Sequence, residues 1–254
     1  MNAKKKDLIR ALLKSIETGE TDAVAVVNEA TYVQHNPHTR EGSEGLAELF
    51  LRLSKTSPRV EVVRCFEDGD FVFAHTEYDF ADKNVGFEVF RFENGQAVEH
   101  WDNIQSRMGP NSSGHTMTDG PTQATDLDRT ESNRQLVRDF IDEVLIQRRL
   151  DSLESYVDRK NYTEHSPQLK DGFDHLVAHL NDTDPKAPAK SYNTIHRVLA
   201  EGNFVLSICE GTRGESHCSF FDLHRIDNGK VVERWDTVDP IPPRQEWNND
   251  NGKF

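Results

Sequence analysis

Two aspartates, Asp102 and Asp236, each follow a tryptophan near the end of a run that alternates apolar and polar residues. The runs read Val98-Glu-His-Trp-Asp102 and Val232-Glu-Arg-Trp-Asp236. Side chains alternate between the two faces of a strand, so each aspartate shares a face with apolar neighbours. Desolvation by such neighbours raises the proton affinity of a carboxylate, which suits a general acid or base near neutral pH. The alternative for both residues is a structural acid, at the surface or paired with an arginine.

A polar run between Tyr32 and Pro37 supplies the second group of candidate residues. Gln34, His35 and Asn36 are expected in a loop after a short helix, at the mouth of a cavity. His35 could transfer a proton there, and the alternative is a histidine that anchors the loop. The second half of the chain keeps the tyrosine and the histidine but changes the residues beside the histidine, as Tyr162, Glu164, His165 and Ser166. We expect His35 and His165 to be catalytic and the tyrosines and amides to bind ligand.

Other polar side chains lie inside the predicted strands. His100 and Arg234 share the faces of the aspartates and are expected to contact a ligand. His75 is a further candidate for ligand binding, although it alternates with aromatic residues as a core histidine does, and the second half has an isoleucine there. The matching acids of the two halves are interpreted as structural ion pairs with nearby arginines, Glu88 with Arg91 and Asp222 with Arg225.

The sequence contains no local motif for a metal or a cofactor. Metal binding is the rival interpretation for the residues His35, His38, His75, His100 and Asp102. However, zinc needs about four ligands, and no HxH, HExxH or paired Cys/His spacing occurs. A P-loop, a GxGxxG fingerprint and a GxSxG elbow are also missing from the sequence. We therefore expect no metal, no nucleotide cofactor and no serine nucleophile.

The candidate residues recur because the chain contains the same sequence pattern twice. Four segments repeat in the same order and at nearly constant spacing: 32–37 with 162–167, 67–72 with 200–205, 90–95 with 224–229, and 98–102 with 232–236. Internal repeats of this length indicate a duplicated domain. The expected division is a first domain at 1–107, a flexible linker at 108–130, a second domain at 131–247 and a frayed tail at 248–254.

Each copy is predicted to begin with helices and to continue as antiparallel strands. Helical spacing predicts helices at 8–16, 21–27 and 43–54, and at 136–145, 150–157 and 173–180. Runs of β-branched and aromatic residues predict strands at 60–66, 71–78, 85–92 and 96–105, with tight turns at Asp68-Gly69 and Asn94-Gly95 and counterparts in the second copy. This order predicts an α+β fold in which a curved sheet wraps a helix and leaves an open cone.

The composition of the chain limits the classes of partner and the compartment that we expect. The formal net charge is -14, so phosphate backbones are repelled and nucleic acid is not an expected partner. The three cysteines form no CxxC pair, which favours a reducing compartment. No apolar stretch approaches the length of a membrane span. We expect a cytoplasmic protein with no membrane partner.

The order Tyr-x-x-His-x-Pro followed by Phe-Arg-x-x-x-Gly-x-x-Val-Glu-x-Trp-Asp resembles the SnoaL-like polyketide cyclase family of the nuclear transport factor 2-like superfamily, and within it a bacterial group of predicted SnoaL-like aldol-condensation-catalysing enzymes. The resemblance spans nearly all of both copies and implies a cystatin-like α+β cone. It also implies a cofactor-free aldol closure in which the last-strand aspartate is the general acid or base. That role falls by position on Asp102 and Asp236, with Gln34, His35 and Asn36 polarising the carbonyl.

Three functions are compatible with these expectations. The favoured one is a cofactor-independent cyclase, isomerase or lyase acting on a small carbonyl compound, with the first copy as the active one if only one site works. The alternatives are a non-catalytic ligand-binding protein and an interaction module. In the last case the two domains would form an internal pseudo-dimer, and a homodimer is also possible.

Overall fold

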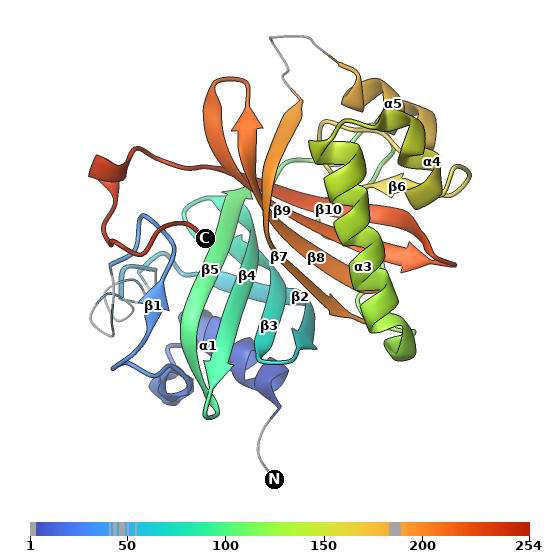
Figure 1. The fold of residues 1–254 in the computed structure, drawn as a ribbon. Coiled ribbons are helices and arrows are strands. Elements are labelled where there is room, and N and C mark those ends of the chain that lie inside the picture. The colour runs from blue at the N-terminus through green and yellow to red at the C-terminus, as the bar shows by residue number, and fades with distance from the viewer. Residues whose placement is uncertain are drawn as a thin grey trace. The chain divides into compact units, whose positions relative to one another are not determined.

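The computed structural model of the chain describes residues 4–40, 42, 45, 49, 51–53, 55–182 and 189–254. These residues form two compact units, and each unit contains a five-stranded sheet (Figure 1). Unit 1 is built from the chain up to Arg107 and from Ile241–Phe254, and unit 2 is Met108–Pro240. The predicted α+β fold with two cone domains is confirmed.

Unit 1 places helices before a meander of long strands. Its elements are α1 (Lys5–Thr18), the 3-10 helix η1 (Thr21–Val26), β1 (Val33–Gln34), β2 (Arg59–Asp68), β3 (Phe71–Asp79), β4 (Lys83–Glu93), β5 (Gln96–Ser106) and the 3-10 helix η5 (Arg244–Glu246). The sheet order is β1-β5-β4-β3-β2, and β1 runs parallel to β5 while the other neighbours are antiparallel. The parallel β1–β5 pair brings the polar run after Tyr32 beside Glu99 and His100 of the last strand.

Unit 2 repeats this arrangement. Its elements are η2 (Leu127–Arg129), α3 (Thr130–Phe140), the π-helix η3 (Ile141–Ile146), η4 (Leu150–Ser152), α4 (Leu153–Tyr156), β6 (Thr163–Glu164), α5 (Phe173–Leu180), β7 (Lys190–Glu201), β8 (Phe204–Arg213), β9 (Ser216–Asp227) and β10 (Lys230–Pro240). The sheet order is β6-β10-β9-β8-β7, with α3 packed across β7 and β8. The two sheets therefore have the same topology.

Local sequence explains the ends of these elements. Helix α1 buries Ile9, Leu12, Leu13 and Ile16, which lie at helical spacing on one face, and it ends at Gly19 in the left-handed conformation. The predicted Asn-Gly turns connect β4 to β5 and β9 to β10, and both residues of each turn have positive φ. Register shifts in β2, β5, β7 and β10 mark bulges, which increase the twist of a sheet and help it to curve around the helix.

Two segments differ from the expected division. Residues 108–130 are not a free linker but part of unit 2, where the buried Asn111 donates from Nδ2 to the Glu164 carbonyl at 2.6 Å. Residues 248–254 are not a frayed tail, and residues 241–247 do not belong to the second domain: both are part of unit 1, where Asn249 and Lys253 are buried. The local composition of the two segments did not indicate this, because they are held by polar contacts rather than by an apolar face. The expected helix at 43–54 falls largely outside the described residues.

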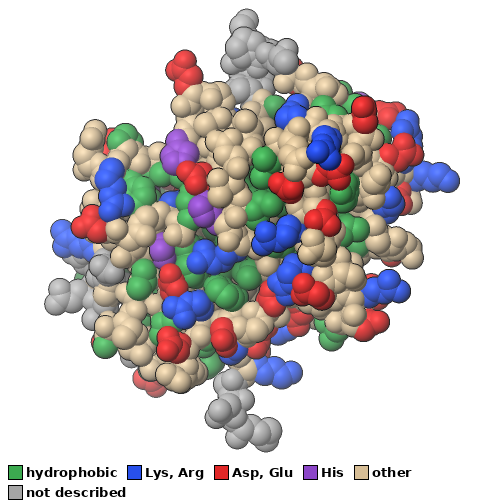
Figure 2. Space-filling view, viewed as in Figure 1, with side chains coloured by type: hydrophobic (Ala, Val, Ile, Leu, Met, Phe, Trp, Pro, Cys, Tyr) green, Lys and Arg blue, Asp and Glu red, His purple; other side chains and the backbone are tan. Residues whose placement is uncertain are grey.

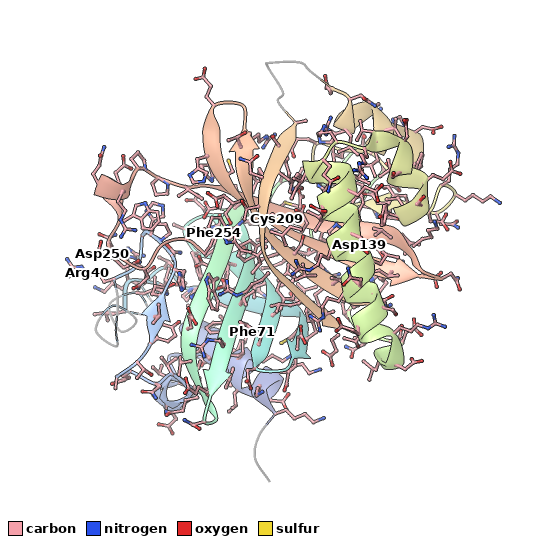
Figure 3. All side chains as sticks on the ribbon, viewed as in Figure 1. Arg40, Phe71, Asp139, Cys209, Asp250 and Phe254 are labelled. Atoms are coloured by element: carbon pink, nitrogen blue, oxygen red, sulfur yellow. The ribbon has the colours of Figure 1, made fainter. Side chains whose placement is uncertain are left out.

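Charged side chains of both signs are interspersed over the face drawn in Figure 2. Figure 3 shows the described side chains on the ribbon and labels Asp250 and Phe254 of the C-terminal segment. Among the described residues, no helix has both the length and the apolar character needed to cross a bilayer.

Candidate functional site

Unit 1 contains a cavity of about 230 Å³ between α1 and the sheet. Apolar side chains of α1 form one wall, while the opposite side carries a group of polar side chains: Tyr32, Gln34, Asn36, Tyr78, Glu88, His100 and Asp102. Pockets for drug-sized ligands usually measure about 300–1,000 Å³. The cavity is therefore suited to a small metabolite.

Asp102 lines this cavity from β5 and is only 5% exposed. Asn36 donates from Nδ2 to Asp102 Oδ2 at 2.7 Å. Lys253 donates from Nζ to the Asp102 carbonyl at 2.8 Å, and the same ammonium lies 3.8 Å from Asp102 Oδ1. Oδ1 itself accepts no hydrogen bond from any described residue. Asp102 is thus fixed in place and keeps one oxygen able to accept a proton.

His100 is bonded at both ring nitrogens. Nδ1 lies 3.1 Å from Gln34 Oε1, which also accepts from the Asn36 backbone amide, so Nδ1 carries a proton. Nε2 lies 2.7 Å from Glu88 Oε2, and Tyr78 donates to Glu88 Oε1 at 2.7 Å. His100 and Glu88 therefore share one proton, either as an imidazolium–carboxylate pair or as a neutral pair. Glu88 pairs with His100 and Tyr78, not with Arg91 as we had expected.

Two tyrosines complete the polar side of the cavity. Burial raises the pKa of Tyr32 well above its ordinary value, and the nearby charges of Glu88 and Asp102 raise it further, so the hydroxyl stays protonated. The Tyr78 ring passes over Gly86, where a Cβ would lie 2.6 Å from Tyr78 Cε2. Gly86 therefore provides the space in which the Tyr78 hydroxyl reaches Glu88.

Among the described residues of unit 1, Glu88, His100 and Asp102 form the group that could hold a cation. One ligand atom from each lies within 4.8 Å of the others, and all three side chains are buried. A cation would have to displace the proton shared by His100 and Glu88. The arrangement can therefore move protons without a metal.

His35 does not line the cavity, contrary to the expectation from sequence. Its ring stacks on Trp101 with centroids 4.7 Å apart, on the other face of β5. Nε2 lies 2.9 Å from Glu99 Oε1, and Nδ1 lies 2.8 Å from the Gly252 carbonyl. Arg91 donates to the other oxygen of Glu99. His35 therefore anchors the C-terminal segment, which is the alternative interpretation of this residue.

His75 also lies away from the cavity. It is fully buried, its Nδ1 lies 2.7 Å from Arg64 Nη1, and its ring packs edge-on against Phe87. Its neighbour Tyr78, three positions along β3, points to the opposite face and lines the cavity. His75 is thus a core histidine rather than a ligand contact.

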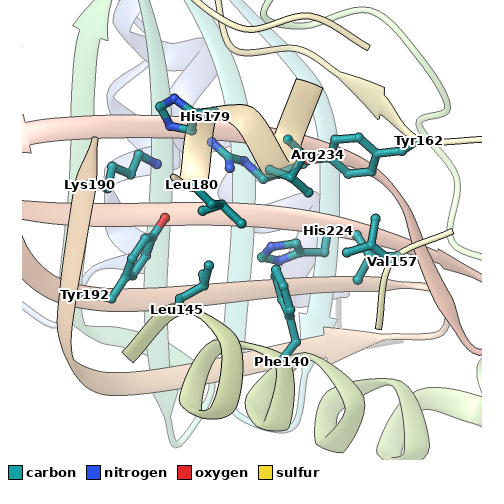
Figure 4. A pocket seen from close by; sticks show the side chains of 12 residues that line it. Phe140, Leu145, Val157, Tyr162, His179, Leu180, Lys190, Tyr192, His224 and Arg234 are labelled. Carbon is teal, nitrogen blue, oxygen red and sulfur yellow. The ribbon is translucent and has the colours of Figure 1, made fainter. Parts of the chain in front are cut away.

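Unit 2 fills the corresponding space with charged side chains (Figure 4). Lys190 Nζ lies 2.8 Å from Asp222 Oδ1 and 2.7 Å from Asp236 Oδ2, and Arg234 Nη2 donates to Asp236 Oδ2 at 2.9 Å. Although burial alone would raise it, the charges of Lys190 and Arg234 hold the pKa of Asp236 well below its ordinary value. Asp236 is therefore a structural ion-paired acid, not a free base.

The space left beneath α3 is only about 10 Å³ and is lined by Phe140, Tyr162, Tyr192, His224 and Arg234 among others. A separate hollow of about 160 Å³ reaches Asp236 and Arg234 from the side of Gln168 and Leu169. Tyr162 donates to Glu164 Oε2 at 2.9 Å, and burial raises the pKa of Glu164 above its ordinary value. Asp222 bonds Lys190 and Tyr192, while Arg225 bonds Glu233, so the expected Asp222–Arg225 pair is wrong.

His165 occupies the place in unit 2 that His35 has in unit 1. It stacks on Trp235, and its Nε2 lies 2.8 Å from Glu233 Oε1. Its Nδ1 lies 2.8 Å from the Thr116 carbonyl. Burial alone would lower its pKa, but the bond to Glu233 and the Thr116 carbonyl raise it overall. His165 is therefore an anchor for residues 108–126 and lies apart from Asp236.

Sequence reasoning missed three residues that shape these sites. Tyr78 looked like a strand core residue, and Lys190 lay outside the repeated segments. Lys253 lay in the expected frayed tail. Only Tyr78 carried a usable signal, because the hydroxyl of a buried tyrosine usually needs a hydrogen-bond partner.

A comparison with family models agrees with the family resemblance over part of the first unit. Residues 9–100 match the model of the SnoaL-like domain. Similar solved structures include a candidate ketosteroid isomerase from Kribbella flavida (18% identity, TM-score 0.38, 46% of this chain and 87% of that chain). Another is IdmH, a candidate polyketide cyclase from Streptomyces antibioticus (16%, TM-score 0.36, 41% and 93%). A comparison with curated proteins gives no match.

Proposed function

We propose that the SnoaL-like domain of unit 1 binds a small carbonyl compound and transfers a proton from the carbon beside its carbonyl group. Asp102 is the base, and Tyr32 donates a hydrogen bond to the developing enolate oxygen. The observation that carries the proposal is the buried Asp102 Oδ1, which accepts no hydrogen bond from the described residues beside a cavity of about 230 Å³.

The neighbouring groups support this division of roles. Asn36 holds the other oxygen of Asp102 and so orients Oδ1. Both nitrogens of His100 are already bonded, so His100 is a positioning residue that keeps Gln34 and Glu88 in place. A protonated phenol next to an enolate oxygen stabilises charge that develops only in the transition state. An enolate formed in this way could attack a second carbonyl of the same molecule, which would close a ring by an aldol step.

The test uses two probes that fit a small cavity. Exchange of the α-protons of cyclohexanone with D₂O is followed by NMR, and closure of heptane-2,6-dione to a cyclohexenone is followed by absorbance. We expect Asp102→Asn to slow both reactions by about 10²–10⁴-fold while probe binding is retained. Tyr32→Phe should slow them by about 10²–10³-fold, as loss of one oxyanion donor does.

Matched controls exist at the same positions of unit 2. Asp236→Asn and Tyr162→Phe change the same residue types in a unit whose aspartate is paired with Lys190 and Arg234, so they should leave both rates unchanged. Exchange that persists at the wild-type rate in Asp102→Asn would refute Asp102 as the base.

A non-catalytic binding role is the second candidate, because the Lys253 ammonium lies 3.8 Å from Asp102 Oδ1 and already offsets its charge. Saturable probe binding with no exchange, in the wild type and in Lys253→Met alike, would favour this second role.

A further inference from the structure

Three side chains of unit 2 converge outside the site described above. Asp119 Oδ1 lies 2.7 Å from His165 Nδ1, and Asp119 Oδ2 lies 3.5 Å from His115 Nδ1. The two imidazole rings have centroids 5.1 Å apart. One ligand atom from each residue lies within 4.8 Å of the others. Two ring nitrogens thus face one carboxylate.

The outer nitrogen of each ring is bonded to a further carboxylate. His165 Nε2 lies 2.8 Å from Glu233 Oε1, and His115 Nε2 lies 3.1 Å from Asp171 Oδ2. Such carboxylates fix the tautomer of a metal-binding histidine and leave the inner nitrogen as the ligand. Asp171 is itself fixed, because its Oδ1 accepts from the Glu164 backbone amide at 2.9 Å.

The inner nitrogens and the carboxylate between them are arranged as ligands of one ion would be. His165 Nδ1 lies 2.7 Å from Asp119 Oδ1 and 2.8 Å from the Thr116 carbonyl, while His115 Nδ1 lies 3.5 Å from Asp119 Oδ2. A divalent cation between these atoms would be held by two imidazoles and one carboxylate. We propose that His115, Asp119 and His165 bind a divalent transition-metal ion, with Zn²⁺ as the best match to two imidazoles and one carboxylate.

The backbone around the cluster supports a built site. Gly120 adopts φ of +93°, and a Cβ there would lie 2.7 Å from Glu233 Oε1 and 2.8 Å from Trp235 Cζ2. Only glycine lets the chain after Asp119 approach the His165–Glu233 pair so closely. His165 is 1% exposed, so one ligand is rigid and buried while His115 and Asp119 remain accessible to an incoming ion.

The ion would link two segments of unit 2. His115 and Asp119 belong to the segment after β5, whereas His165 follows β6 in the body of unit 2. Metal binding would therefore tie residues 108–121 to the rest of unit 2 and stabilise their docking increasingly as the free metal concentration rises above Kd. In unit 1 the equivalent His35 faces the Gly252 carbonyl, and among the described residues it belongs to no group of three candidate metal ligands.

The experiment titrates the full-length protein, first stripped with a chelator, with Zn²⁺ in a calorimeter. We expect one site whose binding releases protons, which is seen as a heat that depends on the ionisation enthalpy of the buffer. Bound Co²⁺ provides a second readout, since Co²⁺ with four ligands absorbs visible light more strongly than Co²⁺ with six. His115→Ala and Asp119→Asn should each weaken this site by at least 100-fold, and Asp171→Asn by about 10–100-fold.

His217→Ala is the matched control. His217 and His196 both contact Glu210 and form another histidine–carboxylate group in the same unit, so this variant tests for nonspecific binding. The expected result is unchanged affinity at the proposed site. Failure to bind Zn²⁺ stoichiometrically, or binding that survives both His115→Ala and Asp119→Asn, would overturn the proposal. Neither result bears on proton transfer in unit 1.

Discussion

Units 1 and 2 share a topology but use the space under their first helix in opposite ways. In unit 1, His100, Glu88 and Asp102 border a cavity of about 230 Å³. In unit 2 the matching positions carry Arg234, Asp222 and Asp236, and they leave only about 10 Å³ beneath α3 and a separate hollow of about 160 Å³ on the side of Gln168 and Leu169. Arg234 is longer and permanently charged, so it reaches Asp236 and fills the volume that His100 leaves open. The exchange of His100 for Arg234, together with Lys190, thus accompanies the change from an open cavity to a charged core.

The outer edges of the two sheets are, in contrast, nearly the same. His35, Glu99 and Trp101 in unit 1 make the contacts that His165, Glu233 and Trp235 make in unit 2. Each histidine also reaches a backbone carbonyl of an anchored segment. The scaffold therefore retains its anchors in both copies, while the interior differs. Substitutions in the two interiors test whether they differ in this way.

The largest effect is expected from Arg234→Leu. This change would leave Glu164, Asp222 and Asp236 buried with Lys190 as their remaining cation. Loss of one member of a buried ion network typically costs about 3–5 kcal/mol. Hydrogen exchange measured by mass spectrometry should show the loss in β9 and β10. His100→Leu in unit 1, which removes only hydrogen bonds, should cost less, at about 1–3 kcal/mol. Equal losses would mean that the two interiors do not differ as described.

An effect of similar size at low pH is expected at His224, which stands where unit 1 has Phe90. Burial lowers the pKa of His224 from 6.5 to about 4. The unfolded chain therefore takes up the proton first, and stability is lost as the pH falls from about 6.5 towards about 4. The loss amounts to about 3 kcal/mol once the pH reaches the folded value.

His224→Phe should remove this part of the acid sensitivity of unit 2. The free energy of unfolding is measured between pH 7 and pH 4 for both proteins. His179, whose pKa burial also lowers to about 4, should leave a residual slope in the variant. If wild type and variant have the same slope over this range, His224 is protonated at no cost and the interior of unit 2 is wetter than the contacts indicate.

Sequence patterns were enough to predict the duplicated fold, because its signals are local. The Asn-Gly turns, the apolar face of α1 and the alternation along the strands each depend on neighbours within a few residues. Asp102 was also assigned to the cavity, because apolar residues flank it on its face of the strand. The same reasoning could not separate Asp102 from Asp236, because the difference comes from Lys190 and Arg234, and the reach of a long side chain is not encoded in a strand's periodicity.

The prediction that the repeated histidines are catalytic shows a different limit of sequence patterns. His35 and His165 occur in both copies at the same place, which attracted a catalytic interpretation. Their shared role is to anchor residues far along the chain, at Gly252 and Thr116. Contacts across such distances in sequence have no local pattern, so neither the anchored segments nor Lys253 could be recognised before the structure was known.

The smallest change in stability is expected from His100→Arg in unit 1, which tests the comparison most directly. The new arginine can reach Glu88 and Asp102 as Arg234 approaches Asp222 and Asp236 in unit 2, so stability should change by less than about 1 kcal/mol. It would also fill the cavity and pair Asp102. Binding of cyclohexanone, followed by ligand-observed NMR, should therefore weaken by about 100-fold, which corresponds to about 2.7 kcal/mol.

His38→Arg is the control for that change, because His38 also borders the cavity but is exposed at its mouth, so it adds the same charge without filling the interior. It should alter binding less than tenfold. A His100→Arg protein that still binds the ketone as the wild type does would show that the cavity is not the binding site. A protein that loses binding only together with its fold would show that unit 1 cannot adopt the charged core of unit 2. A stable protein without binding would establish that the residue at this one strand position decides whether a unit is hollow or filled.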